Sequence, residues 1–400
     1  NAKSVVASFL ERKIPAHIAL QYDDLDVNLI LGKIQFSKID LKIRDRDTTL
    51  NHTFLKVDDL TISGLSHWQF FLRNTIKADE ISVAKPEARY YPSKTFRKTA
   101  GKPKGVVKLL KNIAIGKVAI TQGSFDMAHQ HNDSIKVRAR DINFTLTDGK
   151  TDPNLIKEKI PLTYNGYNFS AEDLFVDLGP FETIKADKLL VSEKNASLTN
   201  MSLKSKYSKA RLSKMVLKEH DYIDLKIPKS SLRNIDFGFD ENRFFFTSQF
   251  GLIENLNLNV YRDKLVADDP VVKKMYSAML RELPLNLNID SLKIVDSQVK
   301  YEENTKRDTK AGSLFFNDVS LTLKNINNNY PKGNKTIAEA EGKLMGIAPV
   351  ALAYSFDVND ENDSFTMAAT VHKLDGKDVN PFLRPNLNVQ LKGTISELYF

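Results

Sequence analysis

Apolar and polar residues alternate along much of this 400-residue chain. The alternation is clearest in segments 39–44, 256–261 and 285–290. Successive side chains of a β-strand point to opposite faces of a sheet, so each of these strands has one apolar face and one polar face. Because such segments recur along the chain, the sequence predicts a mainly β protein, with a large antiparallel sheet and a few short helices.

A thirteen-residue apolar pattern occurs three times, at 78–90, 115–127 and 289–301. A second phrase follows two of these copies, at 141–146 and 318–323, so the two larger units lie about 175 residues apart. A repeated unit with one apolar face favours stacked repeats that share a continuous apolar surface. We therefore expect an elongated, curved sheet that forms a groove, a repeating β-groove.

The repeated pattern contains a change of phase. In the last copy, the apolar residues switch from even to odd positions between Ile294 and Val299. A turn or bulge near Asp296–Ser297 would keep both sets on one face of the sheet. Gly123 and Pro86 occupy the equivalent position in the other two copies, and both residue types permit such a break.

Helical patterns are few. The predicted helices are 2–11, 105–111 and 270–283, and exposed loops are expected at 91–105 and 325–334. In 270–283 an apolar residue recurs every four positions, which fits packing against the sheet or, alternatively, binding at a membrane surface. We expect three segments along the chain, at 1–104, 105–283 and 284–400.

Composition excludes several classes of protein. The chain has no cysteine, which rules out disulfides, thiolate metal sites and cysteine nucleophiles. No run of about eighteen apolar residues occurs, so no segment of the sequence is expected to span a bilayer. The net charge of +8 is mild for this length. It fits contact with anionic lipid head groups and does not require a nucleic acid partner.

Catalytic and metal-binding motifs have little support. There is no Gly-x-Ser-x-Gly elbow and no phosphate-binding glycine-rich loop. His129 and His131 could form a metal-ligand pair, but the turn-forming residues around them favour a hairpin tip. Segment 357–363 superficially resembles a calcium loop, yet it lacks the required glycine and glutamate and is better explained as a hairpin turn. We predict no enzyme activity and no cofactor.

Several segments resemble bacterial AsmA-like proteins. The similar phrases are 81–90, 289–301, 18–25 and 31–41 after the first helix, and 374–383 leading to 391–398. The resemblance covers most of the chain and is weakest over residues 200–250. It rests on apolar strand patterns and carries no catalytic signature.

The resemblance implies a repeating β-groove fold, which the wider group of bridge-like lipid-transfer proteins shares. It also implies a periplasmic protein that is anchored to the inner membrane by a segment preceding Asn1, with both ends of this chain internal to a longer protein. Proteins of this kind carry or conduct phospholipids between membranes, or support outer-membrane assembly. Phospholipids, a membrane and outer-membrane assembly proteins are therefore the expected partners.

Apolar residues of the repeats are the candidate lining of the groove. They are Ile81, Val83, Val118, Ile120, Phe125, Met127, Ile142, Phe144, Leu146, Leu292, Ile294, Val299, Tyr301, Val319, Leu321 and Leu323. Basic residues of one loop are candidates for head-group contact: Lys94, Arg97, Lys98, Lys102 and Lys104. A closed core between two sheets would hide the same apolar residues, and alternation alone does not separate a core from a groove.

Two other functions fit part of the pattern. An assembly factor would engage outer-membrane proteins through exposed strand edges. A carbohydrate-active β-sandwich enzyme would need paired carboxylates at a cleft, and no pair in the sequence is favoured for that role.

Overall fold

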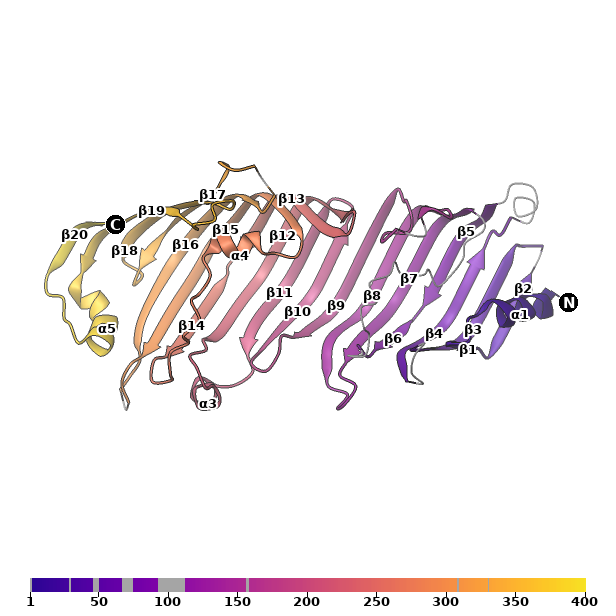
Figure 1. Ribbon diagram of the computed structural model, residues 1–400, viewed down its shortest axis with the longest axis horizontal. Helices are drawn as coiled ribbons and strands as arrows, with labels where there is room; N and C mark the ends of the chain where they lie inside the picture. Colours follow the sequence, from indigo (N-terminus) through magenta and orange to yellow (C-terminus); the bar gives the residue numbers. More distant parts are fainter. Residues whose placement is uncertain are drawn as a thin grey trace. The chain divides into compact units, whose positions relative to one another are not determined.

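The computed structural model describes residues 2–28, 30–45, 50–66, 75–92, 112–155, 158–307, 309–329 and 331–400. The protein is mainly β, with 63% strand against 10% helix, as the alternation predicts. The twenty strands of the described ranges belong to one hydrogen-bonded sheet (Figure 1). The predicted fold class is therefore confirmed.

The chain divides into two compact units. Unit 1 comprises Asn1–Asp177 with Lys188–Glu193, and unit 2 comprises Leu178–Asp187 with Lys194–Phe400. The elements of unit 1 are α1 (Ala2–Lys13), β1 (Ile18–Gln21), β2 (Asp24–Asn28), β3 (Lys33–Arg44), β4 (Asn51–Ser63), β5 (Thr75–Ala84), β6 (Glu87–Tyr90), β7 (Asn112–Ala128), β8 (Ile135–Thr151) and β9 (Gly166–Asp177). Residues of β10 (Glu182–Ser192) belong to both units.

Unit 2 contains the other three described helices and ten further strands. Its strands are β11 (Asn195–Ser205), β12 (Tyr222–Asp240), β13 (Arg243–Glu254), β14 (Asn257–Asp263), β15 (Asn286–Asn304), β16 (Gly312–Asn327), β17 (Lys335–Leu344), β18 (Ala348–Asp357), β19 (Phe365–Asp375) and β20 (Thr394–Tyr399). Its helices are α3 (Lys209–Met215), α4 (Tyr276–Arg281) and α5 (Gly376–Leu387).

The sheet is mixed, and its parallel pairings occur at matching places in the two repeats. In unit 1, β7 runs parallel to β5 and β6, whereas β8 returns antiparallel to β7. In unit 2, β15 runs parallel to β13 and β14, and β16 returns antiparallel to β15. The thirteen-residue patterns at 115–127 and 289–301 thus occupy equivalent strands, which confirms the predicted repeat. The sequence predicted an antiparallel sheet, and the sheet is mixed. Alternation did not indicate the parallel pairings, because it reports the faces of a strand and not its direction.

The predicted change of phase is a β-bulge. The pairing of β15 with β16 shifts register on both sides of Ser297, and Asp296 has a left-handed backbone with φ of 52°. The pairing of β7 with β8 shifts in the same way around Gly123, next to Gln122 with φ of 54°. An extra residue in left-handed conformation turns the following side chains back to the original face.

Left-handed residues also lie beside these bulges, in neighbouring strands or in the short breaks between strands. We call them the bulge row; its members are Lys85, Gln122 and Asp141 in unit 1, and Asn255, Asp296 and Asp318 in unit 2. Backbone hydrogen bonds join a member to the residue that precedes the next member, as between Lys85 N and Thr121 O at 2.8 Å and between Asn255 N and Val295 O at 3.1 Å. Each of these strands therefore bends at the same level as its neighbour.

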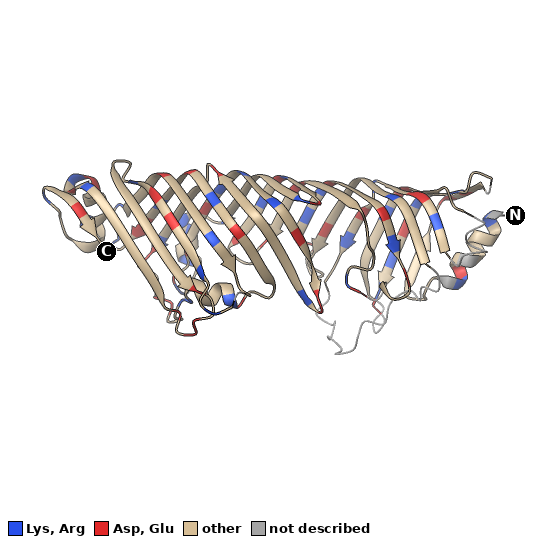
Figure 2. Cartoon of the chain, turned by 90° about the horizontal axis from the view of Figure 1, so that it is seen from above, with Lys and Arg blue, Asp and Glu red and all other residues tan. Residues whose placement is uncertain are grey.

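The bulges leave the sheet of each unit with one apolar face and one charged face. On the apolar face Ile294 pairs with Leu321, and Val299 pairs with Phe316 beyond the bulge. The charged face carries cross-strand ion pairs, including Lys38–Asp58 at 2.7 Å. Residues of both signs are interspersed along the strands (Figure 2).

Fully buried apolar clusters form where a helix lies on the apolar face. In unit 1, Val6 and Leu10 of α1 pack against a cluster that includes Leu25 and Phe36. In unit 2, Val379 of α5 belongs to a cluster with Ala348, Val371 and Leu374. The predicted helix 2–11 is confirmed by α1, whereas the predicted helix 105–111 lies outside the described residues.

The predicted helix 270–283 is shorter than expected, because only Tyr276–Arg281 is helical. The connection 264–285 leaves β14 where Asp263 pairs with Asn304 and rejoins the sheet at Asn286, the other end of β15. It must therefore span the nineteen residues of β15, about 60 Å along the strand. Twenty-two residues in a continuous helix would reach only about 33 Å. An extended stretch is needed before the helix begins.

Two described helices were not predicted from the sequence. The helix α5 contains Pro381 and Pro385, residue types that usually mark a helix boundary. It is stabilised at its start by Asp375, whose side chain accepts a hydrogen bond from Lys377 N at 3.0 Å. The helix α3 spans seven residues, and Ser208 caps its start.

Candidate functional site

The apolar face of unit 2 is built by the strands around its parallel junction. The register places Ile253 of β13 beside Ile294 of β15, and Leu321 of β16 on the other side. On the C-terminal side of the bulge row, Leu258 of β14 lies beside Val299 of β15 in the same way. A continuous apolar floor therefore crosses strands from both sides of the junction.

The sixteen predicted lining residues fall on the apolar faces of the two units. Nine lie in unit 1, namely Ile81, Val83, Val118, Ile120, Phe125, Met127, Ile142, Phe144 and Leu146, and the strand register puts them on one face. Seven lie in unit 2, namely Leu292, Ile294, Val299, Tyr301, Val319, Leu321 and Leu323, which also share a face. What these residues bind remains a prediction.

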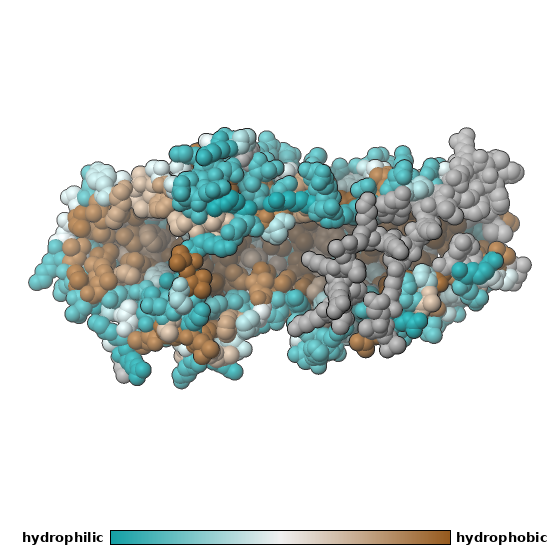
Figure 3. All heavy atoms as spheres, in the orientation of Figure 1, coloured by the Kyte–Doolittle hydropathy of each residue, from teal (hydrophilic) through white to brown (hydrophobic). Residues whose placement is uncertain are grey.

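These side chains are not shielded as a protein core would be. Of the sixteen, only Leu146 is fully buried, and the other fifteen are half-buried. No second sheet faces them within the described part of the chain, because all its named strands belong to one sheet. In unit 2 the molecular surface shows a hollow with a hydrophobic floor between hydrophilic edges (Figure 3). In unit 2 the arrangement is therefore an open groove rather than a sandwich core.

A strap, which we define as residues 264–285, accompanies this groove in unit 2. The Ser277 hydroxyl donates a hydrogen bond to Asp363 at 2.7 Å, and the Arg281 guanidinium pairs with the same carboxylate at 2.9 Å. The ring of Tyr276 lies 6.1 Å from Tyr354, whose strand position is on the apolar face. The helical end of the strap is thus fastened to the β18–β19 hairpin at the edge of the groove.

The strap exposes apolar side chains. Val271, Val272 and Met279 have exposed fractions of 63%, 89% and 55%. Because they occur on a connection beside an apolar floor, they extend the apolar surface beyond the sheet. Periodicity in 270–283 indicated an apolar stripe, but it did not indicate that the residues would be exposed.

The groove of unit 2 has a polar edge near the end of β15. The hydroxyl of Tyr301 donates a hydrogen bond to Glu303 at 2.6 Å, and Arg262 pairs with Asp221 through two contacts of 2.7 Å. Burial and the carboxylate of Glu303 raise the pKa of Tyr301, so the phenol stays protonated at neutral pH. Tyr301 therefore has an apolar ring toward the floor and a polar group at the edge.

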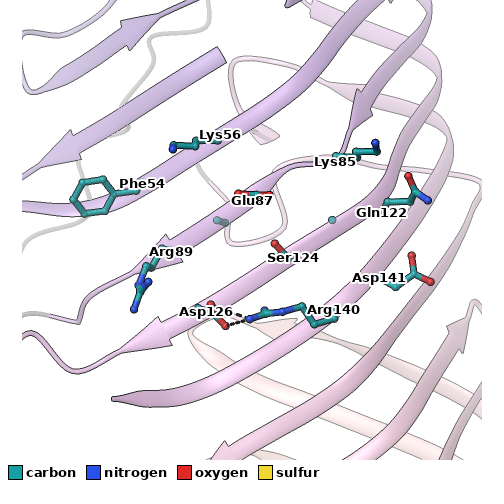
Figure 4. A pocket seen from close by; sticks show the side chains of 12 residues that line it. Phe54, Lys56, Lys85, Glu87, Arg89, Gln122, Ser124, Asp126, Arg140 and Asp141 are labelled. Atoms are coloured by element: carbon teal, nitrogen blue, oxygen red, sulfur yellow. Dashed lines mark hydrogen bonds and ion pairs between the residues drawn. The ribbon is translucent and has the colours of Figure 1, made fainter. Parts of the chain in front are cut away.

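A polar pocket occupies the charged face of unit 1. It has a volume of about 800 Å³ and lies over β4, β6, β7 and β8. Four cationic and three carboxylate side chains line it, and Figure 4 shows Arg140 and Asp126 pointing toward one another. An ion pair of 2.8 Å joins these two groups. The charged side chains that line this pocket make it unsuitable for acyl chains, because a chain inside it would desolvate them.

The two loops considered as metal sites are hairpin turns. His129 precedes the turn between β7 and β8, and its backbone N donates a hydrogen bond to Ser134 O at 3.0 Å. In the turn between β18 and β19, Asp360 accepts a hydrogen bond from Asn362 N at 3.0 Å, and Asp363 is held by the strap. Across the described ranges, no group of three or more His, Cys, Asp or Glu side chains could hold a metal ion.

Some predicted features are outside the described residues. The basic loop with Lys94, Arg97, Lys98, Lys102 and Lys104 belongs to them. No helix in the described part of the chain is long and apolar enough to cross a membrane.

No family model matches the chain, and no curated protein matches it either. The resemblance to AsmA-like proteins therefore remains a prediction from the strand patterns.

Proposed function

We propose that this chain is an AsmA-like, periplasmic module that binds or conducts phospholipid acyl chains along its apolar face. One observation carries the proposal: a single-layer sheet has an apolar face that is half-exposed over both units. Sheets normally bury such a face against a second layer. An acyl chain would supply the missing apolar contact.

The mechanism requires only transfer from water. Each methylene that enters the groove contributes about 0.8 kcal/mol. The contact is non-directional, so a chain in the groove can slide without breaking specific bonds. The polar edge formed by Tyr301, Glu303 and Arg262 would keep the head group in water. This is a transport or binding role and needs no reaction.

A charge on the floor of the groove tests the proposal. We expect Ile294→Arg to reduce uptake of a fluorescent acyl probe at least fivefold, because the new guanidinium would have to be desolvated by the chain. Since Ile294 is half-buried, the free energy of unfolding should fall by only about 1 kcal/mol. Probe titration and urea unfolding of the same preparation measure both effects.

The matched control is Gln298→Arg, which adds the same charge to an exposed position on the opposite face of β15. It should leave probe uptake unchanged. Native mass spectrometry of the wild-type protein should reveal co-purified phospholipid. Finding no lipid, no probe uptake and no difference between the two variants would end the proposal.

A further inference from the structure

The helix α5 separates an apolar cluster from a basic cavity. Val379 and Leu383 pack into the cluster on the apolar face, and the ring of Phe382 lies 6.5 Å from Tyr301. Lys377 and Arg384 instead line a cavity between the helix and the segment 390–393. The same helix therefore borders the groove on one side and a polar site on the other.

The cavity has fixed walls. Its volume is about 520 Å³. Asn380, which is only 6% exposed, donates a hydrogen bond to Leu391 O and accepts one from Leu391 N, both at 2.9 Å. A Cβ atom at Gly376 would lie 2.3 Å from Leu391 O, so the glycine allows the segment to approach the helix this closely. The position of Leu391 is thus set by the fold.

The lining of the cavity has an excess of positive charge. Lys377, Arg384 and Lys392 line it together with one carboxylate, that of Asp375, which gives a difference of two charges. Asp375 pairs with Lys377 at 3.4 Å. Among the described residues, the side chains of Arg384 and Lys392 have no hydrogen-bond or ion-pair partner. Two cations are therefore available to a ligand.

We infer that this cavity binds a phosphate group, with Arg384 and Lys392 as its main donors. Guanidinium and ammonium groups on a concave surface with surplus positive charge recognise phosphate oxygens by charge-assisted hydrogen bonds. The inference rests on the proposed function for the identity of the molecule that bears the phosphate, a phospholipid. Leu391 lines the cavity and also packs on the apolar cluster, and Leu387 and Val389, which lie close to the lining residues in the sequence, are 61% and 54% exposed. This apolar surface favours a lipid head group over free phosphate.

Calorimetric titration with three probes tests the site. The probes are dihexanoyl phosphatidic acid, dihexanoylglycerol, which lacks the phosphate, and inorganic phosphate. The wild-type chain should bind the phosphatidic acid at least tenfold more tightly than the glyceride. The double variant R384Q/K392Q should lose this tenfold preference and bind the glyceride as before. Equal binding of phosphatidic acid by variant and wild type would overturn the inference.

The matched control is K226Q/K293Q, which removes two exposed lysines of unit 2 away from the cavity. It should bind all three probes like the wild type. If it loses as much affinity for phosphatidic acid as R384Q/K392Q does, the effect comes from net charge alone, and the site is overturned. Inorganic phosphate bound as tightly as phosphatidic acid would support the phosphate site and assign free phosphate as its ligand. If the chain binds phosphate through Arg384 but does not bind the glyceride, the phosphate site stands. The proposed binding of acyl chains in the groove is then contradicted.

Discussion

At the residue scale, the bulge row shows why polar residues occur inside strands, as at Asp296, and in the breaks between strands, as at Asn255. Its members are Asp, Asn, Gln and Lys, and Asp296 is typical with φ of 52°. Left-handed backbone is unfavourable for residues with a Cβ, but Asn and Asp tolerate it best. Ser297, next to it, is 1% exposed, and its hydroxyl accepts a hydrogen bond from Leu256 N at 3.1 Å. The bulge is thus held by local hydrogen bonds as well as by pairing.

The identity of Asp296 should matter more for backbone conformation than for contacts. We expect Asp296→Val to lower the free energy of unfolding by about 1–2 kcal/mol, because a β-branched residue is strained at positive φ. Asp296→Gly should be nearly neutral, since glycine adopts this conformation freely. Urea unfolding of both variants measures the difference, with Gln298→Val as the control on the same strand. If valine is tolerated equally at 296 and 298, backbone strain at the bulge is not significant.

Much of the structure at the level of single residues could be predicted from the sequence. The phase change between Ile294 and Val299 located the bulge, because one face of a strand must stay apolar. The sixteen lining residues were placed on common faces for the same reason. Whether that face is open or covered could not be predicted, because Leu146 and Leu323 occupy equivalent positions of the repeated phrase although only Leu146 is buried.

At the element scale, the strap is the connection that the parallel junction requires. The start of β15 lies at the opposite end from the last residue of β14, so the chain must cross the length of the strand. Alternation does not report strand direction, so neither the junction nor the strap could be predicted. The helix α5 was missed because its prolines masked a pattern that tertiary packing of Val379 and Leu383 stabilises.

The fastening of the strap should weaken in acid. Hydrogen bonds from Ser277 and Arg281 lower the pKa of Asp363 below its ordinary value, against the opposing effects of desolvation and of the Asp360 charge. A lowered folded-state pKa means that the contribution to stability is present above the ordinary aspartate pKa of 3.8 and is lost as the pH falls through the folded value. We expect faster hydrogen exchange in residues 276–281 at pH 3 than at pH 6, after correction for intrinsic rates.

Substitution of Asp363 separates this effect from general acid unfolding. Asp363→Asn should exchange rapidly in 276–281 at both pH values, whereas Lys274→Gln, which removes a strap ion pair away from the hairpin, should behave like the wild type. Slow exchange in the Asp363→Asn protein at pH 6 would show that the carboxylate does not hold the strap.

At the scale of the whole molecule, the single layer exposes a large surface. The chain has 24938 Å² of accessible surface. A compact monomer of its mass, 45.3 kDa, would expose about 16,000 Å². The excess fits a sheet whose apolar face is half-exposed and whose opposite face carries ion pairs. A sequence of ordinary composition, with 42% hydrophobic residues, does not reveal this excess.

Calorimetry should detect that this fold buries less apolar surface than a compact protein does. Compact proteins have a heat-capacity change of unfolding of about 12–15 cal/mol/K per residue, or roughly 5–6 kcal/mol/K for a chain of this length. We expect the lipid-free protein to fall clearly below that range, because less apolar surface is newly exposed on unfolding. Scanning calorimetry of delipidated protein checks the value. A result within the range would indicate that the apolar face is covered in solution.

The bulge row has a consequence for how such a protein can change in evolution. Each strand bends at a position set by its own left-handed residue, so a duplicated hairpin brings its own bend and needs no adjustment in its neighbours. Adjacent strands are about 4.8 Å apart, and each added pair would therefore widen the sheet by about 10 Å. Gene duplication could adapt such a sheet to different distances in small, equal steps.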